Sequence, residues 1–142
     1  MLCAARRLVG LLVGALTCAS VAVLAGEGAP GFGVTDIMDA MVVPPSDALF
    51  GVGRAEPDSE QAWIALRHQA VILGEAGRAL TAPGRSRGAE WDAWSVAMSD
   101  AAESAARAID ARDVDAVLFA GGDIIESCTG CHRVYLPLGG AL

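Results

Sequence analysis

The sequence predicts an all-α fold, an antiparallel four-helix bundle, and three observations support this prediction. After residue 33, apolar residues recur at alternating steps of three and four, the spacing of one helix face, in four segments. No segment has the strict alternation that is typical of a strand. The connections between the segments are short, which favours consecutive helices lying side by side in opposite directions. A chain of 142 residues is most economically one such domain.

Residues 1–25 have the pattern of a signal peptide. Arg6 and Arg7 precede an apolar run from Leu8 to Ala25, and small residues close the run where a signal peptidase would cut. We therefore expect export and a periplasmic location. The alternative is an uncleaved membrane anchor, because the apolar run approaches the length that spans a bilayer.

Removal of residues 1–25 changes the charge and the cysteine count. Eight basic residues then remain against 17 acidic ones, a net charge of −9, and Cys128 and Cys131 are the remaining cysteines. Such an acidic surface argues against nucleic acid and anionic membranes as partners and favours basic proteins. Two cysteines three residues apart do not form a disulfide scaffold.

The domain is expected over residues 34–142, after a flexible glycine-rich segment at 26–33. Thr35 is the expected N-cap of a first helix whose apolar face is formed by Val34, Ile37, Met38, Met41 and Val42. Pro44 and Pro45 remove two backbone donors, so this helix should stop or kink there. A short helical restart is expected over 46–50.

Three longer helices should follow. The second should begin after Pro57, capped by Asp58 or Ser59, and the third should run over about 89–112. Asp113 is the expected cap of the fourth, whose apolar stripe is Val114, Val117, Gly121, Ile124, Cys128 and Cys131. The two cysteines are therefore expected to point toward the other helices.

The segment "CTGCH" at 128–132 carries the chemistry. On a helix, Cys128, Cys131 and His132 stand at i, i+3 and i+4, on one face of little more than one turn. Two thiols can then join the two vinyl groups of a haem while the adjacent imidazole reaches the iron, so C-x-x-C-H predicts covalently attached haem c.

Three alternatives compete with haem. Zinc would need four ligands, and the only other histidine, His68, lies far away on the second helix. A redox dithiol usually occupies a helix N-terminus, where the helix dipole lowers the thiol pKa, whereas this pair lies near a helix end. A simple Cys128–Cys131 disulfide would leave His132 without a role.

With this motif near its C-terminus, the chain resembles the class II c-type cytochromes, the cytochrome c prime family. The resemblance covers about residues 34–135 and includes "CTGCH" and the methionines of "DIMDAM" in the first helix. It implies an exported bundle whose first helix crosses the haem on the side away from His132. Met38 then matches the sixth iron ligand best, and Met41 is the second choice. In family members with an open sixth position, small gases such as NO or CO reach the iron.

The chain also departs from that family. Many relatives have an arginine shortly before the methionine, where this chain has Val34, Thr35 and Asp36. Arg133 or Arg67 could supply that charge to the haem propionates. The alanine-rich stretch between Met98 and Ala108 should leave room for a flat group, against which the Trp63, Trp91 and Trp94 rings could pack.

The expected function is electron transfer by a monohaem c-type cytochrome that is not an enzyme, because no catalytic constellation is visible. The expected partners are redox proteins with a basic docking surface, and a homodimer is possible on the family resemblance. The alternative function is binding of NO or CO by five-coordinate iron.

Overall fold

The helical prediction is confirmed. In the computed structural model, which describes residues 31–136, the chain folds into four helical rods, and this part of it has no strand. The first rod consists of α1 (Val34–Ile37), the π-helical turn η1 (Met38–Val42) and α2 (Val43–Gly51). The other three are α3 (Glu60–Leu80), α4 (Ala89–Asp110) and α5 (Val114–Tyr135). The expected signal peptide lies outside the described residues, and no helix within them is long and apolar enough to span a membrane.

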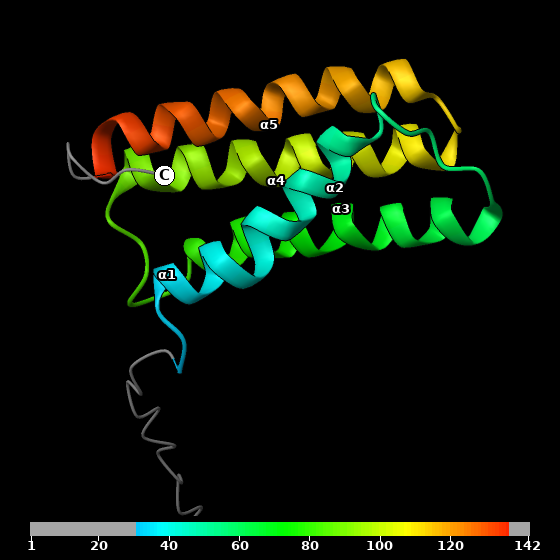
Figure 1. Cartoon of the computed structure of the whole chain (residues 1–142). Helices are drawn as coiled ribbons and strands as arrows, with labels where there is room; N and C mark the ends of the chain where they lie inside the picture. The colour runs from blue at the N-terminus through cyan, green and yellow to red at the C-terminus, as the bar shows by residue number, and fades with distance from the viewer. Residues whose placement is uncertain (1–30, 137–142) are drawn as a thin grey trace, which may run out of the picture.

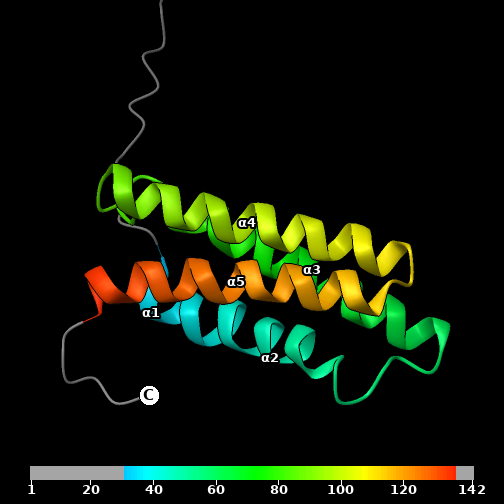
Figure 2. The ribbon, with the colours of Figure 1, turned by 90° about the horizontal axis from the view of Figure 1, so that it is seen from above.

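The arrangement of the rods can be followed in Figures 1 and 2. α4 lies along both α3 and α5, and α2 lies against α3 and α5. α1 and η1 pack on α3. The cysteine-bearing end of α5 and α1 are at the same end of the molecule in both views.

The core fills the space between the rods. Leu73, Ile109 and Ile124 are fully buried, and they come from α3, α4 and α5. The predicted stripe of the last helix is largely confirmed, because Val117, Gly121 and Ile124 are buried while Cys128 and Cys131 are partly buried against the same core.

Most of the predicted helix ends are confirmed. Ser59 caps α3 by accepting a hydrogen bond from the Ala62 amide, and Asp113 caps α5 by accepting one from the Ala116 amide. α4 ends at Asp110, two residues earlier than expected, because Arg112 adopts a left-handed backbone conformation with φ of 58°. The amides of residues 112 and 113 then bond back to the carbonyls of Ile109 and Ala108, as in a Schellman motif.

The start of the first rod differs from the prediction. Thr35 is not the N-cap; the cap is Gly33, whose amide donates to the Asp36 carboxylate at 2.8 Å, so the helix begins at Val34. The rod also does not stop before the prolines. Its backbone passes through the π-helical turn and continues as α2, which places the prolines in the first turn of α2.

Candidate functional site

The last two turns of α5 bring the three residues of the C-x-x-C-H motif onto one side of one helix. Cys128, Cys131 and His132 are all partly buried. Both cysteines carry free thiols and pack against the core. The predicted grouping of two thiols and one imidazole on a single helical turn is therefore present in the fold.

Gly130, between the two cysteines, is the place where α4 approaches this turn most closely. A Cβ atom built on Gly130 would lie 2.6 Å from Cζ2 and Cη2 of the Trp94 ring. The indole therefore occupies the space that any side chain at residue 130 would take. This contact packs the turn that carries both cysteines against α4.

An aromatic pair lies one helical turn after Cys131. The rings of Tyr135 and Trp91 meet edge to face, with centroids 5.0 Å apart and an interplanar angle of 89°. The Trp91 Nε1–H donates to the Leu80 carbonyl at 2.9 Å, and the Arg87 guanidinium lies 4.8 Å above the Trp91 ring. The end of α5 thus packs on the start of α4 through the two rings. The hydrogen bond to Leu80 and the cation–π contact with Arg87 hold the Trp91 side of this pair in place.

Burial governs the ionisation of both thiols. It raises the pKa of Cys128, with a smaller lowering from the hydrogen bond of Ser127. It also raises the pKa of Cys131, where the negative charge of Glu90 acts in the same direction and the positive charge of Arg87 opposes it. Both groups therefore stay protonated thiols at neutral pH, unlike the low-pKa thiolate of a redox dithiol.

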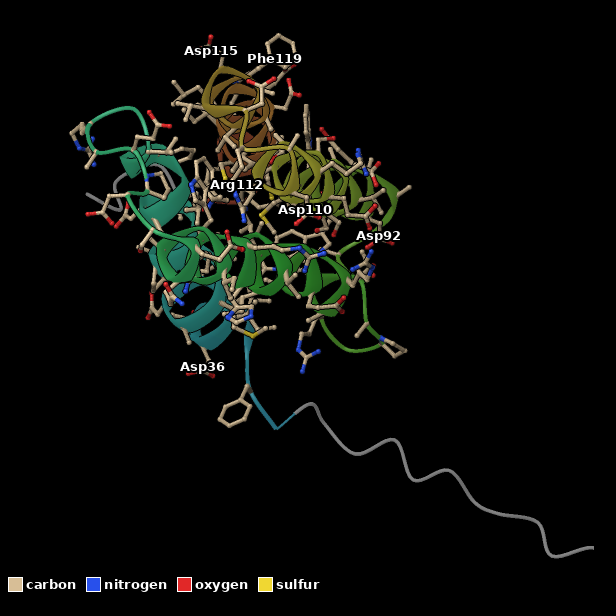
Figure 3. All side chains as sticks on the ribbon, turned by 90° about the vertical axis from the view of Figure 1, so that its right-hand side faces the viewer. Asp36, Asp92, Asp110, Arg112, Asp115 and Phe119 are labelled. Carbon is tan, nitrogen blue, oxygen red and sulfur yellow. The ribbon has the colours of Figure 1, made fainter. Side chains whose placement is uncertain are left out.

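His68 and Trp63, which are both on α3, lie away from the turn that carries the motif. His68 is exposed on α3. Trp63 is buried under the Arg112 guanidinium, 5.1 Å from its ring centroid, and Arg112 follows the end of α4 opposite the cysteines (Figure 3). Of the three predicted aromatic neighbours, the structure thus brings Trp91 and Trp94 to the motif and leaves Trp63 at the other end.

The two arginines expected to supply positive charge, Arg67 and Arg133, lie in different parts of the molecule. Arg67 pairs with Asp110 at 2.7 Å, at the end of α4 that Figure 3 shows nearest the viewer, so of the two arginines expected to supply charge to the propionates, Arg67 lies away from the motif. Arg133 is exposed beside His132. Arg87, in the loop before α4, is a further basic residue that acts on the motif, because its charge lowers the pKa of Cys131.

The alanine-rich stretch is buried in the fold. Ala101, Ala102, Ala105 and Ala108 are at most 8% exposed, because α4 packs closely against its neighbours along this stretch. The stretch also begins about one turn beyond Trp94, the residue that contacts the motif.

Two surface hollows lie elsewhere. One, of about 550 Å³, is lined by Pro44, Ala48, Ala62, Ala65 and Leu66 between α2 and α3. The other, of about 450 Å³, lies between α4 and α5 beside Phe119, which projects outward from the bundle with Asp115 in Figure 3. Neither is lined by the cysteines or by His132.

Sequence reasoning missed the supporting residues of the motif. Gly130 sits within the quoted motif and Tyr135 closely follows it, but their partners Trp94 and Trp91 are about 40 residues earlier in the chain. The available signal was a glycine inside a helix, which costs stability unless something packs against it.

Within residues 31–136, no three His, Cys, Asp or Glu side chains are grouped so that they could hold a metal ion. Comparisons of the chain with protein-family models, curated proteins and solved structures find no match.

Proposed function

We propose that the chain is an exported, periplasmic c-type cytochrome that carries electrons and is not an enzyme. One haem c would be attached through Cys128 and Cys131, with His132 as the proximal iron ligand. The observation that carries the proposal is the placement of two free thiols and one imidazole on one side of one turn of α5, against the core. The bound haem would supply the one-electron chemistry.

The chemistry of the donor set fits this group. Thioether formation requires two thiols that are neither paired with each other nor bound elsewhere, and Cys128 and Cys131 are both free. Zinc would require two further ligands near these thiols. A redox dithiol would require a lowered thiol pKa, whereas burial raises the pKa of both.

We further propose that the bundle is antiparallel, and two contacts between α2 and α5 support this arrangement. A Cβ on Gly53 would meet the Leu118 side chain at 3.2 Å, and a Cβ on Gly121 would meet the Phe50 ring at 3.5 Å. From Gly53 back to Phe50 is three residues, and from Leu118 to Gly121 is three residues forward. The two segments therefore run in opposite directions where they meet. Continuing this spacing from Phe50 to Met38 leads from Gly121 to Arg133, the neighbour of His132.

The contact of Phe50, on α2, with Gly121 also favours Met38 over Met41 as the sixth ligand, because it identifies the side of the first rod that faces α5. Phe50 directly follows the buried Leu49, just as Met38 directly follows the buried Ile37. Met41 instead precedes the buried Val42. It thus corresponds to Ala48, which lines the hollow toward α3. A thioether ligand on the iron favours the ferrous state and raises the reduction potential.

A difference in helix packing supports room for the haem on this side. α2 packs on α3 and α5, whereas α1 and η1, where the methionines lie, pack on α3. Met38 and Met41 are both partly buried. A flat group held by α5 could therefore enter between α5 and the start of the first rod.

The same observation favours a second candidate function. If the first rod keeps its distance from α5, the sixth position of the iron stays open. The protein would then be a five-coordinate haem protein that binds NO or CO, with Met38 as a wall beside the gas.

The proposal is tested on chain expressed in cells that mature c-type cytochromes. After denaturation and acid–acetone extraction, the polypeptide should stay red and its mass should include one haem. The Cys128→Ala/Cys131→Ala variant should lose both properties. A colourless wild-type chain without the added mass overturns the proposal. In the red protein, a low-spin ferric spectrum indicates methionine ligation, and a high-spin spectrum that CO shifts indicates gas binding.

A further inference from the structure

The π-helical turn η1 ends directly before two consecutive prolines, and its hydrogen bonding explains why the rod tolerates them. The Val43 amide donates to the Met38 carbonyl, five residues back instead of four. In an uninterrupted α-helix, the nitrogens of Pro44 and Pro45 would face the carbonyls of Ala40 and Met41 without a hydrogen to donate, and their rings would clash there. The π turn starts a new first helical turn at Val43, where proline needs no donor.

This turn also adds one residue to the spacing of the core positions. Ile37 and Val42 are five residues apart, yet both are buried, at 4% and 6% exposure. The backbone absorbs the extra residue at Val42, whose φ of −109° departs from the ordinary helical value. Downstream, the buried positions Val42, Pro45, Leu49 and Val52 return to steps of three and four.

The extra residue decides which side chain of the first rod faces α5 near His132. In a continuous α-helix that keeps Val42 buried, the core position one turn earlier falls on Met38 instead of Ile37. Neighbouring residues point about 100° apart, so Asp39 would then take the side that Met38 now occupies. The change would rotate the segment before Val42 and leave α2 in place, because α2 is held by both α3 and α5.

We propose that Pro44 and Pro45 are positioning residues: they maintain the π turn and thereby place Met38, rather than Asp39, on the side of the first rod that faces α5. This placement is a property of the polypeptide. Its meaning as the choice of the sixth iron ligand rests on the proposed function.

The test compares two variants by NMR of the ¹³C-labelled methionine methyl groups in the full chain. The wild type should show nuclear Overhauser contacts from the Met38 methyl to α5 and from the Met41 methyl to α3. Pro44→Ala/Pro45→Ala restores both donors, so the turn should relax to an α-helix and the contacts of Met38 with α5 should be lost. Deletion of the exposed Ala40 in that background returns Ile37 and Val42 to one face, and these contacts should reappear.

Each outcome decides the proposal. If the double alanine variant keeps the contacts of Met38 with α5, the prolines do not set the register and the proposal is overturned. If the Ala40 deletion does not restore them, or if both variants lose the helical circular dichroism of the wild type, it is also overturned. If the double variant unfolds and the Ala40 deletion restores both the fold and the methyl contacts, the proposal is supported, because correcting the register then replaces the prolines.

A second readout connects the register to the iron. In haem-loaded protein, the double variant should convert a low-spin ferric spectrum to a high-spin one, and the Ala40 deletion should reverse the change. If the wild type carries no haem, the proposed function fails. The methyl contacts still decide whether the prolines position Met38.

Discussion

Because Gly130 has no side chain, the Trp94 ring can pack directly on the backbone of the cysteine-bearing turn. The residue lies between Cys128 and Cys131, and the Trp94 ring occupies the volume where its Cβ would stand. Since close-packed interiors do not yield a methyl-sized space without strain, this position tolerates no larger residue. The close packing of the cysteine-bearing turn on α4 therefore depends on the glycine between the two cysteines.

We expect Gly130→Ala to lower the free energy of unfolding by about 1–3 kcal/mol, because the new methyl group overlaps the indole. Urea unfolding followed by tryptophan fluorescence measures this change. Gly122→Ala is the matched control on the same helix: no atom lies within 4 Å of its Cβ, so it should be neutral or stabilise by up to about 1 kcal/mol. Equal effects at both positions would contradict the role of Trp94.

Met38→Ala should convert a low-spin ferric haem spectrum to a high-spin one, because it removes the thioether sulfur that we propose as the sixth iron ligand. Met41→Ala is the control and should leave the spin state unchanged, since Met41 corresponds in position to Ala48 beside α3. Absorption spectra of the two ferric proteins check both expectations. A spin change in the Met41 variant alone would transfer the ligand role to that residue.

At the scale of elements, α3 and α4 pack as closely as their small residues allow. A Cβ on Gly77 would lie 2.6 Å from the Ser95 carbonyl oxygen and even closer to the Ser99 hydroxyl. One turn earlier, the Gly74 carbonyl accepts a hydrogen bond from that hydroxyl at 2.9 Å. This close approach fixes the distance between the two helices next to the end of α4 that contacts the motif.

We expect Gly77→Ala to destabilise the fold by about 1–3 kcal/mol, because its methyl group meets backbone that cannot move without separating the helices. Gly74→Ala should cost less, since its Cβ would make ordinary contacts, the nearest at 3.7 Å with Ala102. Thermal and denaturant unfolding of the two variants compare the effects. An equal loss at both positions would show that helix spacing is not the cause.

At the scale of the whole molecule, acidic side chains outnumber basic ones, 17 to 10. Several of the basic groups are paired: Arg67 with Asp110, Arg78 with Glu75 and Glu103, and Arg112 with Glu60. The surplus negative charge should therefore act on partners over a distance, at a strength set by ionic strength.

The rate of electron transfer from the reduced haem protein to tris(phenanthroline)cobalt(III), a cation, should fall as salt is raised. The rate with hexacyanoferrate(III), an anion, should rise, since salt screens repulsion in that pair. Stopped-flow absorbance of the haem measures both. Equal salt dependence of the two oxidants would contradict an acidic docking surface.

Local sequence predicted the parts of this fold that depend on neighbouring residues. Ser59 and Asp113 cap their helices through amides three residues on, and the stripe of α5 follows from helical periodicity. The grouping of Cys128, Cys131 and His132 is equally local, because one helical turn contains it. Local reasoning failed at Thr35, because the Gly33 amide donates to the Asp36 carboxylate and Gly33 caps the helix. It expected an interruption and a restart at the prolines, but it did not identify the π turn that precedes α2.

The sequence by itself determined the helices and the chemical set of the motif, because backbone hydrogen bonding and side-chain spacing act over a few residues. Only the tertiary structure decided that Trp94 packs on Gly130, that Arg87 lies beside Cys131 and that Arg67 is engaged far away with Asp110. These interactions join residues that are far apart in the sequence. They depend on how the rods pack side by side, which no local pattern specifies.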